Sequence, residues 1–236
     1  LRLATLRASI IGGFVFRIGI GALPFLLPLL LQIGFGLTPF QSGLVTFASS
    51  AGAMSMKPLA ARIIRTFGFR NIMIINAVVS SLFLAACALF TPATPLLLIT
   101  LILAVGGFFR SLQFTAINTV AYAEVETAKM SRATTLVSVN QQLAISTGVA
   151  VGALCVETTM QWRGLTELSA EAFAPAFLVV AVLSAMSAYF FWKLPDDAGH
   201  EISGRKAMEI SSRKGAAQAA EKAANETTPD TRDQRL

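Results

Sequence analysis

Long runs of apolar residues, separated by short polar links, fill most of the first 195 positions of the chain. Six of these runs reach the roughly 20 residues that a helix needs to cross the core of a bilayer. They cover positions 10–31, 42–60, 72–90, 96–121, 134–156 and 173–192, and the second is the least apolar. The runs lack the alternation of a membrane β-strand, and lipid offers no partner to free backbone groups. The pattern therefore predicts an all-α integral membrane protein, a bundle of six transmembrane helices.

The composition agrees with lipid as the main solvent of the chain. Only 14% of the residues are charged and the mean hydropathy is +0.65, whereas soluble domains carry about 25% charged residues. After residue 195 the sequence turns polar and keeps hardly any large apolar side chain. Such a segment cannot bury enough apolar surface to fold. The predicted domains are therefore a membrane bundle at 1–195 and a disordered cytoplasmic tail at 196–236.

The positive residues alternate between the two sides of the predicted bundle. They precede the first run, occupy the second and fourth links and follow the sixth run. The first and third links carry no charge, and the fifth holds one arginine against three glutamates. Because cytoplasmic links are enriched in Lys and Arg, both termini are predicted to be cytoplasmic. The same rule makes the net charge of +6 a membrane feature rather than a sign of nucleic-acid binding.

Two arginines, Arg17 and Arg110, stand inside apolar runs. A charge in the middle of a membrane helix costs about 2.5–3.5 kcal/mol on insertion scales, so it needs a partner. The six runs contain no Asp or Glu, which leaves a backbone carbonyl, water, a residue outside this chain or a substrate. Two interpretations stay open: a structural role beside a helix break, or an electropositive cavity for anionic groups.

Polar and small residues in the runs supply the remaining candidates. Arg17, Gly21, Pro24, Pro28 and Gln32 follow helical spacing on one face, and three amides stand in series in the fifth run. Glycine allows close helix contact, and proline invites a kink. The predicted substrate-binding residues are Arg17, Gln32, Arg110, Gln113, Asn118, Asn140, Gln141 and Gln142. The predicted bending or packing residues are Gly21, Pro24, Pro28, Gly148 and Gly152.

Enzymatic chemistry finds no support in the sequence. No nucleophile elbow, HExxH motif or glycine-rich phosphate loop occurs. Cys87 and Cys155 lack the spacing of a metal or redox pair, and the sole histidine, His200, lies in the polar tail. We expect neither a catalytic site nor a metal, and no cofactor.

Three segments carry a family resemblance: R-I-G-I-G-A-L-P-F at 17–25, L-Q-I-G-F-G at 31–36 and P-F-Q-S-G at 39–43. With six spans and a basic second link, the region 1–195 resembles one half of a major facilitator superfamily transporter. It is most similar to the fourteen-span drug:proton antiporter family and its MdtD-like bacterial exporters. One departure is that Arg65 and Thr66 precede Phe67 and Gly68, where the family often has an Asp-Arg pair.

The resemblance implies a multi-pass transporter of the inner (cytoplasmic) membrane, present here as its C-terminal half. Its implied partners are the lipid bilayer, a small-molecule substrate, protons and the N-terminal half of the same transporter. The leading hypothesis is proton-coupled export of drugs or other small organic compounds, with substrate bound between the halves. One alternative is an exporter of organic anions or metal chelates, motivated by the two arginines. Another is a non-transporting membrane half-module that assembles with a partner chain.

Overall fold

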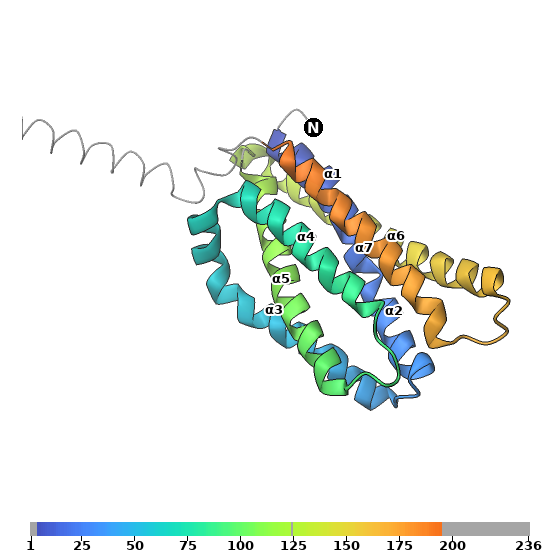
Figure 1. Ribbon diagram of the computed structural model, residues 1–236. Coiled ribbons are helices and arrows are strands. Elements are labelled where there is room, and N and C mark those ends of the chain that lie inside the picture. The colour runs from blue at the N-terminus through green and yellow to red at the C-terminus, as the bar shows by residue number, and fades with distance from the viewer. Residues whose placement is uncertain (1–3, 124, 195–236) are drawn as a thin grey trace, which may run out of the picture. The chain divides into compact units, whose positions relative to one another are not determined.

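The computed structural model describes residues 4–123 and 125–194, and every regular element within them is helical (Figure 1). The predicted tail at 196–236, including His200, lies outside the described residues. The helices are α1 (Ala4–Gly21), α2 (Leu23–Leu29), the π-turn η1 (Leu30–Gly34), α3 (Pro39–Phe67), α4 (Phe69–Cys87), α5 (Leu96–Tyr122), the 3₁₀ turn η2 (Thr127–Lys129), α6 (Met130–Arg163) and α7 (Ala170–Trp192). The predicted all-α bundle is confirmed.

Helix α1 lies at the centre of the bundle. It packs against α5, α6 and α7, while α3 lies along α5 and α4 packs on both α5 and α7 (Figure 1). Large side chains from α1 and α7 fill the interior, and Phe16, Phe173 and Phe177 have almost no exposed surface. Helices α1 and α7 thus contribute large side chains to one core.

Five helical units are long and apolar enough to cross a membrane by length and composition, among the described residues. They are α1 with its continuation to Gly34, then α4, α5, α6 and α7. Helix α3 is not among them, because its sequence mixes small polar residues with Lys57, Arg62 and Arg65. It stays a predicted span, although it packs in the bundle like the others.

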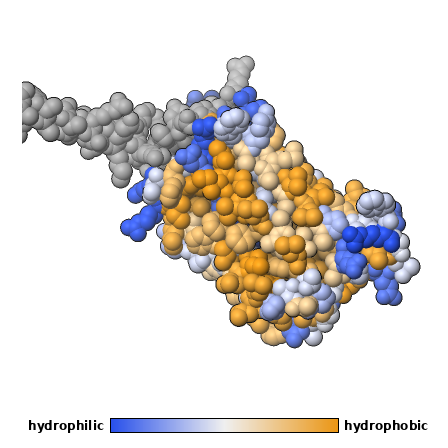
Figure 2. Space-filling view, viewed as in Figure 1, coloured by the Kyte–Doolittle hydropathy of each residue, from blue (hydrophilic) through white to orange (hydrophobic). Residues whose placement is uncertain are grey.

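Apolar side chains cover much of the outside of the bundle. Figure 2 shows hydrophobic residues over most of the visible face, with hydrophilic ones gathered toward its ends. Phe40 and Leu97 each expose 80% of their surface. A water-soluble protein of this size rarely exposes so continuous an apolar surface, so the bundle presents its outside to lipid.

The first predicted span is not one regular helix. Helix α1 ends at Gly21, and α2 begins with Pro24 in its first turn, where a missing backbone N–H costs nothing. Pro28 lies inside α2 and removes a further backbone N–H donor. The helix then widens into a single π-helical turn at Leu30–Gly34. The backbone is therefore irregular over the second half of the span.

The second predicted link is much shorter than expected. Thr38 and Gln41 form a capping box that begins α3, and the helix continues through Arg62 and Arg65 to Phe67. Gly68, at φ +80°, alone separates α3 from α4. The prediction that the basic residues lie between two helices was wrong: the helix extends beyond its apolar part, since Arg and Lys are good helix formers.

Candidate functional site

A cavity of about 400 Å³ lies between α2, α3 and α5. Its wall combines an apolar surface with a few hydroxyl groups and one positive charge. The residues that define this outer cavity are Leu23, Pro24, Leu27, Pro28, Gly43, Thr46, Phe47, Ser49, Ser50, Leu103 and Arg110. Of the sequence-predicted residues, the structure therefore brings Pro24, Pro28 and Arg110 together.

Arg110 is held in the cavity wall by a residue of the neighbouring helix. Its Nη2 donates a hydrogen bond to Ser49 Oγ over 2.9 Å. The backbones of α3 and α5 touch here, because a Cβ on Gly107 would overlap with the carbonyl group of Ser49, and one on Gly52 with that of Ala104. Two glycines thus set the distance across which Arg110 and Ser49 meet.

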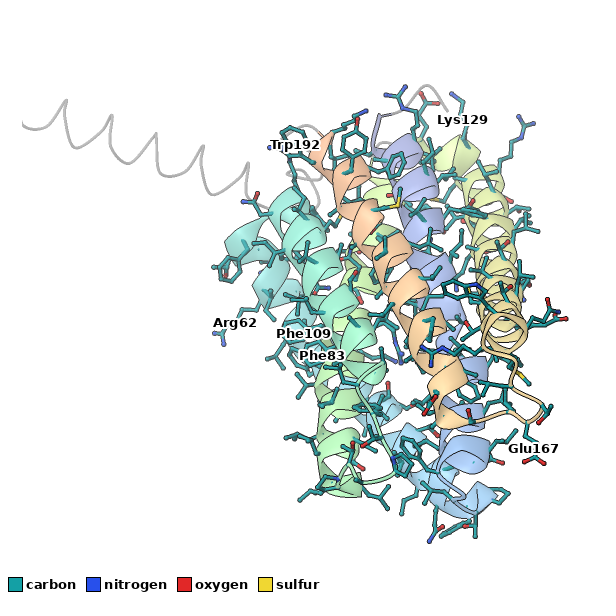
Figure 3. The ribbon with its side chains drawn as sticks, turned by 45° about the vertical axis from the view of Figure 1, so that its right-hand side comes forward. Arg62, Phe83, Phe109, Lys129, Glu167 and Trp192 are labelled. Atoms are coloured by element: carbon teal, nitrogen blue, oxygen red, sulfur yellow. The ribbon has the colours of Figure 1, made fainter. Side chains whose placement is uncertain are left out.

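A second, smaller cavity of about 20 Å³, which we call the inner cavity, is lined by residues of α1 to α5 and adjoins the outer cavity. It shares Ser49 and Arg110 with the outer cavity and adds Ser80, Phe83 and Cys87 from α4. The Phe83 ring stacks on Phe109 of α5, with centroids 5.7 Å apart (Figure 3). This stacked pair braces α4 against α5 beside the inner cavity.

Arg17 has a different environment from Arg110. It is 1% exposed and lines neither cavity. Its Nη2 donates to Asn118 Oδ1 over 2.7 Å, and its guanidinium lies 5.3 Å from the centre of the Phe114 ring. A Cβ on Gly13 would lie 2.8 Å from Nη1, so that glycine leaves room for the charge. This geometry favours the structural interpretation for Arg17 and leaves Arg110 as the cavity arginine.

Gln113 lies in the contact between two helices rather than in a cavity wall. It is fully buried; its Nε2 donates to the Met73 carbonyl over 3.0 Å, and its Oε1 accepts from Asn76 Nδ2 over 3.2 Å. Asn76 also donates to the Phe109 carbonyl over 2.6 Å. The amide therefore joins α5 to α4, and its proximity to Arg110 in sequence does not place it beside the same space.

The three consecutive amides of α6 have three different surroundings. Asn140 donates from Nδ2 to the carbonyl of Ile10 on α1 over 3.1 Å. Gln141 is half-buried, and Gln142 is exposed on the outside of the bundle. None of the three lines either cavity, so their proposed contact with substrate stays a prediction.

The glycines of α6 bring that helix onto α1. A Cβ on Gly148 would overlap with the Ile18 carbonyl group, and one on Gly21 would lie 2.7 Å from Ile145 Cα. Gly152 packs less closely, since an added Cβ there would lie 3.2 Å from Ala22 Cβ. Close packing is thus one role for these positions, as small residues allow in membrane helices.

Gln32 occupies the π-turn beyond the outer cavity. Its Nε2 lies 3.5 Å from Ser42 Oγ at the start of α3. Gln32 is not part of either cavity wall. The contact links the irregular end of the first span to the next helix.

Sequence reasoning missed Ser49 and Ser80 as wall residues and Asn76 as the partner of Gln113. Asn76 carried a usable signal, since an amide inside a predicted span needs a partner. The serines carried none, because small hydroxyl residues occur throughout the runs. Among residues 4–123 and 125–194, no three His, Cys, Asp or Glu side chains gather as a metal-binding cluster.

Comparison with known proteins places this bundle in a family. The family model described as Major Facilitator Superfamily matches residues 9–226. A protein of Yersinia enterocolitica is 32% identical over 197 residues, which are 81% of this chain and 41% of that protein. Proteins of Serratia proteamaculans and of Enterobacter sp. strain 638 are also 32% identical, over 81% and 85% of this chain and 40% and 43% of their own lengths.

All three relatives carry the name "Putative multidrug resistance protein MdtD". The chain spans about two fifths of the length of these relatives. The matches confirm the resemblance seen in the motifs between residues 17 and 43. The chain belongs to the Major Facilitator Superfamily, a family of membrane transporters and not of enzymes.

Proposed function

We propose that this chain is the C-terminal half of a secondary transporter that exports drugs or other small organic compounds. The observation that carries the proposal is the outer cavity, whose apolar wall holds a single cation. Its volume of about 400 Å³ falls in the range of roughly 300–1,000 Å³ that small-molecule sites occupy. Multidrug resistance in the names of the relatives supports the same substrate class.

The wall of the outer cavity offers both apolar and polar contacts to a ligand. Leu23, Leu27 and Phe47 offer apolar surface to the body of a compound, while Arg110 and the hydroxyl of Ser50 offer hydrogen-bond donors. A small number of polar groups in an apolar wall is what fixes the orientation of a ligand. In the proposed transporter the opposite wall comes from its other half, and rocking of the halves exposes the cavity alternately to each side.

The proposed orientation places the basic end of the bundle in the cytoplasm. Figure 3 shows Lys129 and Trp192 at one end of the helices and Glu167 toward the other. The link of Lys129 holds two basic residues, Lys129 and Arg132, whereas the link of Glu167 holds one arginine and three glutamates. The excess of positive charge on cytoplasmic links then places both termini in the cytoplasm.

The groups that couple transport to protons lie outside the helices that line the outer cavity in this proposal. The first acidic residue of the chain is Glu124, so α1 to α5 contain no carboxylate. Carboxylates and histidines are the usual proton carriers within membranes. We propose that the proton carrier belongs to the half of the transporter that this chain does not include.

A second candidate, export of organic anions, is favoured by Arg110. It is the sole charged residue in the wall of the outer cavity, and it faces that cavity from α5. A wall with a cation and no acid attracts anionic groups and repels cationic ones. This charge separates the second candidate from an exporter of cationic drugs.

Everted membrane vesicles that contain the complete transporter test both candidates. Uptake of a labelled cationic dye is compared with uptake of a labelled aromatic carboxylate, in vesicles with the native protein, Arg110→Gln or Arg62→Gln. Arg62 is an exposed arginine of α3 and is the charge-matched control. Carboxylate uptake that is lost only in Arg110→Gln supports the anion exporter, and dye uptake alone ends that candidate. Folded protein that moves neither compound contradicts the proposed function.

A further inference from the structure

We propose that the inner cavity binds a single halide ion, which is chloride under cellular conditions. The donors of the site are Arg110, Ser49 and Ser80. Because Arg110 and Ser49 also line the outer cavity, this site adjoins the proposed substrate site. The argument rests on charge, on an unpaired donor and on size.

Among the residues that the structure describes, no carboxylate forms an ion pair with Arg110. Residues 1–123 include no Asp or Glu, and the hydrogen bond of Arg110 that the structure shows is to the neutral hydroxyl of Ser49. The guanidinium carries five N–H donors, so this single contact leaves most of them available. A cation among membrane helices calls for a partner, and an anion is the partner that also balances its charge.

Ser80 is a second, independent observation that indicates a ligand in the inner cavity. It is 2% exposed, and its Oγ has no hydrogen-bond partner among the described residues, although it lines the inner cavity. A buried polar group without a partner is uncommon and costs free energy. Its neighbour Ser81 is also buried, but the Ser81 hydroxyl donates to the Ala77 carbonyl over 2.7 Å. The unsatisfied hydroxyl is therefore the one that borders the space.

Ser49 completes the donor set. Its Oγ accepts the hydrogen bond from Arg110, which leaves the hydroxyl hydrogen free to donate, since a serine hydroxyl both accepts and donates. Gly107 holds the Ser49 backbone against α5. One guanidinium and two hydroxyls thus belong to residues that line the inner cavity, and each of them can donate a hydrogen bond to an anion.

The size of the inner cavity selects a monatomic ligand. Its volume is about 20 Å³, and one water requires about 10–15 Å³ by the same measure. The inner cavity therefore has room for a small ion, and it is far smaller than the outer cavity of about 400 Å³. Chloride fits this volume and the donor set, and water alone would leave the guanidinium charge unbalanced.

Chloride binding is tested with the purified transporter in detergent. The thermal unfolding midpoint is recorded while sodium chloride replaces sodium gluconate at constant ionic strength, then with bromide in place of chloride. We expect a saturable rise of the midpoint with chloride and bromide and none with gluconate, which is too large for the site. Broadening of the ³⁵Cl NMR line, reversed by bromide, gives a second readout.

Two adjacent serines localise the site. Ser80→Ala removes a proposed donor and is expected to raise the half-saturating chloride concentration about tenfold, the effect of losing one hydrogen bond to a charged group. Ser81→Ala is the matched control and should leave that concentration unchanged. Arg110→Gln should abolish the chloride-dependent rise of the unfolding midpoint. If Arg110→Gln does not fold, the two serine variants still test the proposal. Superimposable chloride and gluconate titrations, or equal half-saturation in both serine variants, overturn the proposal.

Discussion

Arg17 on α1 donates a hydrogen bond of 2.7 Å to Asn118 on α5, so a buried cation is met by a neutral amide rather than by a carboxylate. The Phe114 ring lies beside the same guanidinium, and the Nε of Arg17 has no hydrogen-bond partner among the described residues. Asn118 and Phe114 therefore each contribute much of the stabilisation of the buried Arg17 charge. The contact also ties the central helix to the helix that carries Arg110.

Asn118→Ala is expected to destabilise the bundle, because it removes the side-chain acceptor of Arg17. A hydrogen bond to a charged group contributes about 1.5–3 kcal/mol, and a protein of this size loses roughly 2–4 °C in midpoint for each kcal/mol. Thermal unfolding in detergent measures the change. Asn118→Asp, which supplies a counter-charge at the same position, should unfold no earlier than the native protein. An equal loss in both variants would show that the amide matters for a reason other than Arg17.

Gly52→Ala should lower stability, because its Cβ would overlap with the Ala104 carbonyl where α3 touches α5. Overpacking of this kind costs about 1–3 kcal/mol. Gly43 is the matched control on the same helix, since a Cβ there meets no atom within 4 Å. Gly43→Ala should stabilise by up to about 1 kcal/mol through helix propensity. Opposite shifts of the two unfolding midpoints are the expected result, and a shared direction would contradict the close approach of α3 and α5.

Gln113→Leu is expected to cost about 1–3 kcal/mol, because it removes a buried partner of Asn76. Asn76→Leu alone should cost a similar amount, since it leaves the Gln113 Oε1 without its donor. The double substitution replaces both polar groups by apolar ones and should cost less than the sum of the single changes. A thermodynamic cycle from the three variants measures the coupling. Strict additivity would mean that the two amides do not interact.

Arg70→Gln should loosen the end of α7. The Nε and Nη2 of Arg70 donate to the Trp192 carbonyl over 3.2 and 3.0 Å, at the C-terminus of that helix. A cation there is worth about 0.3–1 kcal/mol through the helix dipole alone. Hydrogen exchange in the last turn of α7 should become faster, and Arg70→Lys should give an intermediate rate because it keeps the charge without the planar fork. Arg62→Gln, at an exposed position on α3, is the control and should leave α7 unchanged.

The apolar runs were enough to predict the helices and the class of protein, because a continuous apolar run of this length satisfies its backbone hydrogen bonds in lipid by forming a helix. The motifs from Arg17 to Gly43 likewise indicated the family that the comparison confirmed. The ends of the helices were harder to predict from the sequence. Helix α3 continues through Arg62 and Arg65, because a helix can extend beyond its apolar part. It ends only at Gly68.

Sequence by itself determined that Arg17 and Arg110 both need a partner, since their position in apolar runs fixes the cost of their charge. Only the tertiary structure decided which partner each one has. Arg17 meets Asn118 in the packed interior, whereas Arg110 meets Ser49 at the wall shared by two cavities. The reason is that the distance between helices determines whether a cavity forms. That distance is set by contacts between helices, such as the contact of Gly107 with Ser49, and the residue pattern of a single helix does not reveal these contacts.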